Sequence, residues 1–180
     1  QLLRLLAAHG AQATFFLLAE KAAAQPELVR QMLDAGHQIS LHGLRHNDCW
    51  RMSLSRQRRE LRSALAILRS LGCEIRDYRP PYGRIRAGQM RLLRQHGLRL
   101  RLWTVIGRDW RGDNAEQLAA RLRQRAADGA VICLHDAPAG HARLGSAAAM
   151  LDALRSLLPE WRQQGYRFIT YDQAEAEAAR

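Results

Sequence analysis

The sequence predicts an α/β fold in a single domain built on a parallel sheet. Buried-strand patterns alternate with amphipathic helical patterns along most of the 180 residues. No linker or low-complexity segment divides residues 1–180, and this length suits one domain. Strands separated by helices need crossover connections, which place the strands parallel to one another.

Glycine and proline mark the ends of most of the predicted elements. The first helix ends at His9-Gly10, and Pro26 begins the helix that Gly36 ends. Ser53 or Ser55 can cap the longest helix. The predicted helices cover 1–9, 26–35, 53–71, 88–96, 115–127 and 146–158, with the last resuming after Pro159. The predicted strands cover 13–18, 37–41, 74–78, 98–106, 130–135 and 166–171, and 136–140 is predicted to be a loop.

The net charge of +11 is carried almost entirely by arginine, since Lys21 is the only lysine. A charge of this sign is compatible with binding to nucleic acid or to an anionic surface. The arginines are scattered along helical segments such as 56–62 and 121–125, at positions that form solvated helix faces. We therefore expect no sequence-specific nucleic-acid binding, whereas attraction to an anionic polymer or envelope surface stays open.

Cysteine usage and hydropathy exclude other classes of protein. Cys49, Cys73 and Cys133 lie far apart without a CxxC pair, so neither a disulfide framework nor a cysteine zinc site is indicated. No segment is apolar for long enough to span a bilayer, so we expect no transmembrane segment. The first residues lack the pattern of a signal peptide.

Two histidines follow the predicted strand 37–41. His42 and His46 are four residues apart, and on a helical turn this spacing stacks two imidazoles on one face, within reach of a single metal ion. The alternative is that they are ordinary polar residues of a surface turn. The pair alone is a weak signal.

Three further polar clusters follow other predicted strands. They are 79–83, Asp109 with Trp110, and His135 with Asp136. Each cluster also has a purely structural explanation. The alternatives are a rigid turn at 79–83, a helix cap at Asp109 with Trp110 as a lid on the core, and a capped strand end at His135 and Asp136. Because the carboxyl ends of parallel strands form the ligand-binding face of α/β proteins, four clusters together favour a functional site.

The order of these motifs resembles that of the polysaccharide deacetylase family, the NodB-homology domain of carbohydrate esterase family 4. The family's histidine motif resembles 36–46, its arginine motif matches 79–83, its tryptophan motif resembles Asp109-Trp110, and its last motif matches 134–136. The resemblance extends from about residue 13 to 170. It implies a distorted (β/α) barrel of the polysaccharide deacetylase type.

The resemblance also implies a metal site and an oxyanion donor. His42 and His46 would ligate a divalent metal ion, most often zinc. Tyr82 would offer its backbone N–H to the oxyanion. A metal ion that polarises an acetyl carbonyl and activates water, together with an N–H donor for the tetrahedral oxyanion, suits acetyl hydrolysis.

Five other residues take roles from the same resemblance. Arg79 would orient the catalytic carboxylate, and His135 would be the general acid, tuned by Asp109. Trp110 and Leu134 would shape the acetyl pocket. An imidazolium is suited to protonating the leaving amine.

Two features depart from the family pattern. The family has a strand ending in an Asp-Asp pair that supplies the catalytic base and the third metal ligand, and this sequence has no Asp-Asp pair. It opens within the helix that would follow, so we expect the first strand to be missing and the domain to be N-terminally incomplete. Of the nearest carboxylates, we expect Asp48 to brace the histidine loop and Asp136 the strand end. Ile106 also stands where the family's tryptophan motif often has an acidic residue.

The resemblance implies metal-dependent hydrolysis of N-acetyl or O-acetyl groups on a polysaccharide such as chito-oligosaccharide, peptidoglycan or another N-acetylated glycan. It also implies a location in the bacterial cell envelope or outside the cell. Two alternatives stay open. One is a carbohydrate-binding protein without catalysis, and the other is a basic domain associated with the envelope or with nucleic acid.

Overall fold

A computed structural model describes residues 1–136 and 146–180, so most of the predicted loop at 136–140 lies outside the described residues. The fold divides into two compact units. The larger unit contains 12–102 and 169–180, and the smaller unit contains 1–11 and the described part of 103–168. Each unit is described by itself.

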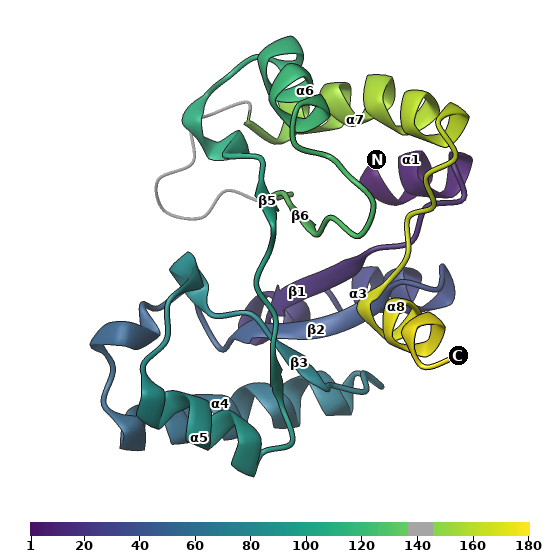
Figure 1. Cartoon of the computed structure of the whole chain (residues 1–180). Coiled ribbons are helices and arrows are strands. Elements are labelled where there is room, and N and C mark those ends of the chain that lie inside the picture. Colours follow the sequence, from purple (N-terminus) through teal and green to yellow (C-terminus); the bar gives the residue numbers. More distant parts are fainter. Residues whose placement is uncertain (137–145) are drawn as a thin grey trace. The chain divides into compact units, whose positions relative to one another are not determined.

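The larger unit is built on a four-stranded parallel sheet in the order β1-β2-β3-β4. Its strands are β1 (Thr14–Leu18), β2 (Gln38–Gly43), β3 (Asp77–Tyr78) and β4 (Arg99–Leu100). Its helices are α2 (Ala19–Ala23), α3 (Pro26–Asp34), α4 (Leu54–Ser70), α5 (Ala87–Gln95) and α8 (Tyr171–Ala178), with 3₁₀ turns at Cys49–Arg51 and Pro81–Gly83. Figure 1 shows α4 and α5 lying together beside β3.

The longest helix, α4, shows how the sequence builds the core of this unit. The Ser53 hydroxyl accepts a hydrogen bond from the Arg56 amide at 3.3 Å, which is the cap that the sequence predicts. Leu61, Leu65 and Leu68 recur at helical spacing and are all buried. Burial of each such side chain contributes about 1.5–3 kcal/mol.

The register of the sheet brings the ends of β2 and β3 together. Leu41 opposes Tyr78, and the Arg79 amide donates to the Leu41 carbonyl at 2.9 Å. His42 and Arg79 are the next residues along these neighbouring strands. Parallel pairing therefore brings the histidine and arginine motifs to the same edge of the sheet.

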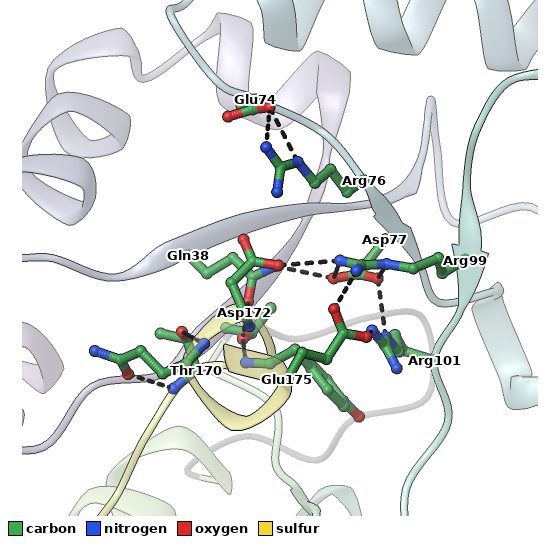
Figure 2. Close-up of polar contacts among 12 residues, drawn as sticks. Gln38, Glu74, Arg76, Asp77, Arg99, Arg101, Thr170, Asp172 and Glu175 are labelled. Carbon is green, nitrogen blue, oxygen red and sulfur yellow. Dashed lines mark hydrogen bonds and ion pairs between the residues drawn. The ribbon is translucent and has the colours of Figure 1, made fainter. Parts of the chain in front are cut away.

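The C-terminal helix α8 is fastened to this sheet by ion pairs around the fully buried carboxylate of Asp77 (Figure 2). Asp77 accepts hydrogen bonds from Nε of Arg99 at 2.7 Å and from Nε of Arg101 at 2.8 Å. The hydrogen bond that Arg99 donates to Asp77 raises the pKa of Arg99 above its usual value. On α8, Asp172 pairs with Arg99 at 3.0 Å, and Glu175 pairs with both arginines.

The smaller unit contains a two-stranded parallel sheet of β5 (Val105–Ile106) and β6 (Ile132–Cys133). Its helices are α1 (Leu2–Ala8), α6 (Ala115–Arg123) and α7 (Ser146–Gln163), with a 3₁₀ turn at Asp109–Arg111. Helices α6 and α7 pack together (Figure 1), and Leu118, Leu122 and Leu157 have no exposed surface.

The predicted α/β fold with a parallel sheet is confirmed. Strand hydrogen bonds among residues 1–136 and 146–180 form one four-stranded and one two-stranded sheet, and they do not show a closed barrel. The predicted strand 98–106 is wrong as a single element. It contains β4 and β5, which belong to different sheets, because the chain passes from the larger to the smaller unit at Trp103.

Two predictions near the C-terminus are also wrong. Helix α7 continues through Pro159, where we expected an interruption, and Leu158 and Trp161 are buried on either side of the proline. Burial on both sides keeps the helix packed despite the lost N–H. The predicted strand 166–171 is absent from the described structure. Instead Thr170 caps α8, and Thr170 and Gln173 each accept the other's amide proton through their side-chain oxygens.

A buried histidine makes the stability of the larger unit depend on pH. His37 is 5% exposed, and its Nδ1 accepts a hydrogen bond from the Ala13 amide at 3.2 Å. Burial lowers the pKa of His37 below its ordinary value of 6.5. The unfolded chain therefore takes up this proton first, so the contribution of His37 to stability is present above pH 6.5 and is lost as the pH falls below it.

Replacing His37 with asparagine should make unfolding less sensitive to acid. The side-chain oxygen of asparagine can still accept from Ala13, but it does not titrate. We expect the midpoint of thermal unfolding to fall less steeply in His37→Asn than in the parent between about pH 7 and pH 5. Circular dichroism at a series of pH values measures both slopes. Equal slopes would show that His37 is not responsible.

Candidate active site

The two predicted metal-binding histidines lie side by side in the larger unit. His42 is the penultimate residue of β2 and His46 follows in the loop. Their ring centroids are 5.1 Å apart at an interplanar angle of 61°. The ring of Tyr82 contacts His46 edge-on, with centroids 4.8 Å apart. We call His42, His46 and Tyr82 the histidine cluster.

A backbone carbonyl sets the protonation of His42. Its Nδ1 lies 2.7 Å from the carbonyl oxygen of Arg79. A carbonyl only accepts hydrogen bonds, so Nδ1 carries the proton and a neutral ring has its lone pair on Nε2. Metal-binding histidines usually donate their second nitrogen to a carbonyl or carboxylate in this way.

These two imidazoles fit part of the coordination shell of a zinc ion. Imidazole suits zinc, which usually takes four ligands in a tetrahedral arrangement. Within 1–136 and 146–180, no group of three or more His, Cys, Asp or Glu side chains is arranged to hold a metal ion. The two histidines therefore fit two of the four positions of such a shell.

Asp48 braces the loop of the histidine cluster, as the sequence analysis expected. Its Oδ1 accepts a hydrogen bond from the Trp50 amide at 3.1 Å and caps the 3₁₀ turn that begins at Cys49. Its Oδ2 pairs with Arg84. These contacts tie the loop after β2 to the segment that follows Tyr82.

The side chain of Arg79 is buried inside the larger unit. Its guanidinium lies over the Phe16 ring, 3.9 Å from the centroid. It donates to the Leu102 carbonyl at 2.9 Å and to the Tyr171 hydroxyl at 3.1 Å. The contact between Arg79 and Tyr171 was not predicted from the sequence, because Tyr171 falls in the predicted strand 166–171. Orientation of a catalytic carboxylate by Arg79 stays a prediction.

Tyr82 adopts a left-handed backbone conformation with φ 61° and ψ 6°. This conformation costs a non-glycine residue roughly 1–2 kcal/mol and persists where the surroundings impose it, often at functional sites. Pro80 and Pro81 precede it and are fully buried. The rigid turn therefore fixes the Tyr82 backbone beside His46, while the oxyanion role of its N–H stays a prediction.

The smaller unit contains the predicted general acid and its partner. Asp109 is 2% exposed. Its Oδ2 accepts from the backbone N–H of His135 at 2.6 Å, and its Oδ1 lies 2.9 Å from Nδ1 of the same residue. The two contacts fix the position and the orientation of the imidazole. With Nδ1 donating to the carboxylate, Nε2 is the nitrogen that can exchange a proton with a ligand.

Trp110 and Leu134 surround this pair. The Trp110 ring meets the His135 ring edge-on, with centroids 5.0 Å apart. The Leu134 side chain packs so closely on Gly107 that a Cβ at that position would collide with it. We call Asp109, Trp110, Leu134 and His135 the acid cluster.

The predicted site residues thus fall into two groups. The histidine cluster and Arg79 belong to the larger unit, and the acid cluster belongs to the smaller unit. Asp136, the other nearby carboxylate, is exposed. Tyr171 is the contact that sequence reasoning missed, and the Thr-x-x-Gln pattern at 170–173 is the signal that would have placed it at a helix start.

Comparisons with known proteins agree on one family. The sequence model for polysaccharide deacetylase matches residues 1–101. The chain is 31% identical over 163 residues to a peptidoglycan-N-acetylglucosamine deacetylase of Bacillus cereus, covering 90% of this chain and 58% of that protein. It therefore spans little more than half the length of that relative. It is also 30% identical over 171 residues to a chitooligosaccharide deacetylase of Bradyrhizobium sp., covering 91% of this chain and 78% of that one.

Solved structures give the same result. A crystal structure of a peptidoglycan N-acetylglucosamine deacetylase superimposes with a TM-score of 0.87 at 29% identity, covering 95% of this chain and 78% of that one. Some members of the family are pseudoenzymes. The sequence and structural matches together show that the chain belongs to the polysaccharide deacetylase family, the NodB-homology domains of carbohydrate esterase family 4.

Proposed function

We propose that the chain is a metal-dependent deacetylase that removes acetyl groups from an N-acetylated glycan of the peptidoglycan or chito-oligosaccharide type. The observation that carries this proposal is the pairing of His42 and His46, with Nδ1 of His42 on the Arg79 carbonyl. This is how a protein prepares an imidazole for a metal ion. The substrate class follows from the names of the two curated relatives.

In the proposed site, His42 and His46 would hold a divalent metal ion, for which zinc is the first candidate, since the family generally uses a divalent metal. When bound, such an ion polarises the acetyl carbonyl and makes water a stronger nucleophile.

The backbone N–H of Tyr82 stabilises the oxyanion in this proposal. A donor that is already fixed when negative charge develops costs no reorganisation, and one such donor typically contributes about 10²–10³-fold in rate. The buried Pro80 and Pro81 and the left-handed Tyr82 give the turn that rigidity.

His135 acts as the general acid and Asp109 holds it in place. As the carbon–nitrogen bond breaks, Nε2 of a protonated His135 gives its proton to the departing amine, and the acyl group leaves as acetate. The base that takes a proton from the attacking water would be a carboxylate oriented by Arg79, and no described residue is assigned to that role. Trp110 and Leu134 shape the pocket for the acetyl methyl group.

The main alternative is a glycan-binding protein without turnover. Two observations favour it. The sequence has no Asp-Asp pair, and the described residues contain no group of three or more His, Cys, Asp or Glu side chains arranged to hold a metal ion. The other alternative, a basic envelope- or nucleic-acid-associated domain, has only the net charge of +11 in its favour.

One set of assays separates the three functions. The chain is incubated with zinc and either acetylated chitohexaose or intact peptidoglycan, and free acetate is measured alongside glycan binding. Acetate release supports the deacetylase, and glycan binding without release supports the non-catalytic protein. Binding to duplex DNA that falls steeply with salt, with no glycan binding, supports the basic domain.

A peptidoglycan substrate would place the protein in the bacterial cell envelope or outside the cell. Among the described residues, no helix combines the length and apolar character needed to cross a membrane.

A further inference from the structure

The hydroxyl of Tyr171 completes a closed set of hydrogen bonds with Arg79. The Arg79 guanidinium donates to the Tyr171 oxygen at 3.1 Å and to the Leu102 carbonyl at 2.9 Å. The Tyr171 hydroxyl in turn donates to the same carbonyl at 2.8 Å. Burial raises the pKa of Tyr171, so the hydroxyl keeps its proton and remains a donor.

We infer that Tyr171 is a positioning residue for the histidine cluster, because it fixes the Arg79 side chain and thereby the Arg79 carbonyl that orients His42. This inference rests on the proposed metal site. The side chain and the backbone of Arg79 make different contacts. Its guanidinium contacts Tyr171, and its carbonyl oxygen accepts a hydrogen bond from Nδ1 of His42 at 2.7 Å.

The other contacts of the Arg79 guanidinium confine it, and they include a hydrogen bond from Nε to the Arg101 carbonyl at 3.4 Å. The same guanidinium lies 3.9 Å from the centre of the Phe16 ring, and Arg79 is 9% exposed. A buried guanidinium that loses an acceptor must shift toward another one or leave a donor without a partner, which costs about 1–3 kcal/mol. The guanidinium and the carbonyl belong to the same residue, which immediately follows the short strand β3. We therefore expect a shift of the side chain to move the carbonyl oxygen as well.

Contacts other than the Tyr171 hydroxyl hold helix α8 in position. These contacts therefore fix the position of Tyr171. The Tyr171 amide donates to Oγ1 of Thr14 at 3.1 Å, and the Asp172 amide donates to Oε1 of Gln38 at 3.2 Å. Further along the helix, Glu175 pairs with Arg99 and Arg101 (Figure 2). Loss of one anchor therefore need not release the helix.

The test uses Tyr171→Phe, which removes one oxygen and keeps the ring that packs against Arg101 and Phe16. Glu175→Gln is the matched control on the same helix, because it weakens the ion pairs of α8 and leaves the Tyr171 hydroxyl in place. Tyr166→Phe is a second control for the loss of a tyrosine hydroxyl. His42→Ala reports whether the metal site exists.

Two properties are measured on the full chain. The first is zinc affinity, followed through the histidine ring signals in nuclear magnetic resonance spectra. The second is the tautomer of His42 without metal, read from its ring ¹⁵N shifts. Mutation of a residue that hydrogen-bonds directly to a metal-binding histidine typically lowers metal affinity by about 10–100-fold. Tyr171 acts through Arg79, one contact further away, so we expect Tyr171→Phe to lower zinc affinity by about 3–10-fold.

Tyr171→Phe should therefore weaken zinc binding and make the His42 tautomer mixed. Glu175→Gln should lower the unfolding temperature while zinc affinity and tautomer stay as in the parent, and Tyr166→Phe should change neither property. Parent zinc affinity in Tyr171→Phe, with binding lost in His42→Ala, would overturn the positioning role. If His42→Ala binds zinc like the parent, the proposed metal site itself is wrong. In that case an unchanged His42 tautomer in Tyr171→Phe would still overturn the link from Tyr171 to His42.

Discussion

Replacement of His135 by alanine should reduce acetate release by about 10²–10⁴-fold, which is the usual loss when a positioned general acid is removed. The Asp109 carboxylate holds the His135 ring through Nδ1 at 2.9 Å, so Nε2 is left to donate to the departing amine. Zinc affinity should remain at the parent level, because the metal is proposed to bind to His42 and His46. The rate is measured as acetate released from acetylated chitohexaose.

The matched control for this variant is His96→Ala. His96 caps α5 with its Nδ1 on the Leu92 carbonyl at 3.0 Å and lies outside both clusters. We expect it to retain the parent rate. If His135→Ala also turned over substrate at the parent rate, or if added zinc fully restored it, His135 would be a structural residue at the end of β6.

The second large effect is expected at the metal ligands. His42→Ala and His46→Ala should each abolish zinc retention, because a site with one remaining imidazole has lost one of its two proposed protein ligands. Acetate release should be lost with the metal. Elemental analysis after dialysis against metal-free buffer measures retention directly.

Two other histidines serve as controls for metal retention. His9 and His96 each end a helix, α1 and α5 respectively, rather than a strand. Alanine at either position should leave zinc content as in the parent. Equal loss in all four variants, or loss in none, would contradict the assignment of His42 and His46.

The local geometry of both clusters follows from patterns visible in the sequence. Parallel pairing of two buried strands places His42 beside Arg79, since Leu41 and Tyr78 are register partners. The hydrogen bond between Asp109 and His135 likewise joins the ends of two paired strands. Asp109 lies shortly after β5, and His135 lies shortly after β6. Residues at the ends of paired strands are predictable because pairing fixes their separation.

Contacts with the C-terminal helix could not be predicted in the same way. Tyr171 and Arg79 are 92 residues apart in the sequence, and no periodicity indicates which side chain a C-terminal helix will meet. Arg99 and Arg101 alternate with leucines along the predicted strand 98–106. The structure directs both to the buried Asp77, which satisfies its charge through them.

The element boundaries that were predicted wrongly depend on tertiary contacts that the local sequence pattern does not show. The segment 98–106 alternates leucine with arginine as far as Leu102 and stays largely apolar to Ile106. Its two ends pair with different strands, β3 and β6. Pairing partners are a tertiary property, so local pattern alone predicts one long strand. Pro159 was expected to interrupt α7 because proline is a local helix breaker. Burial of Leu158 and Trp161 outweighs this local effect, so the helix continues.

The central claim is that this chain hydrolyses acetyl groups with a metal ion held by His42 and His46. The most direct measurement is acetate release from acetylated chitohexaose by the parent chain as prepared with zinc, after chelation, and after zinc is returned. We predict release with zinc, none after chelation, and recovery on return of the metal, with no recovery in His42→Ala. Glycan binding with no acetate release in the presence of zinc would contradict the account, and so would release that chelation leaves unchanged.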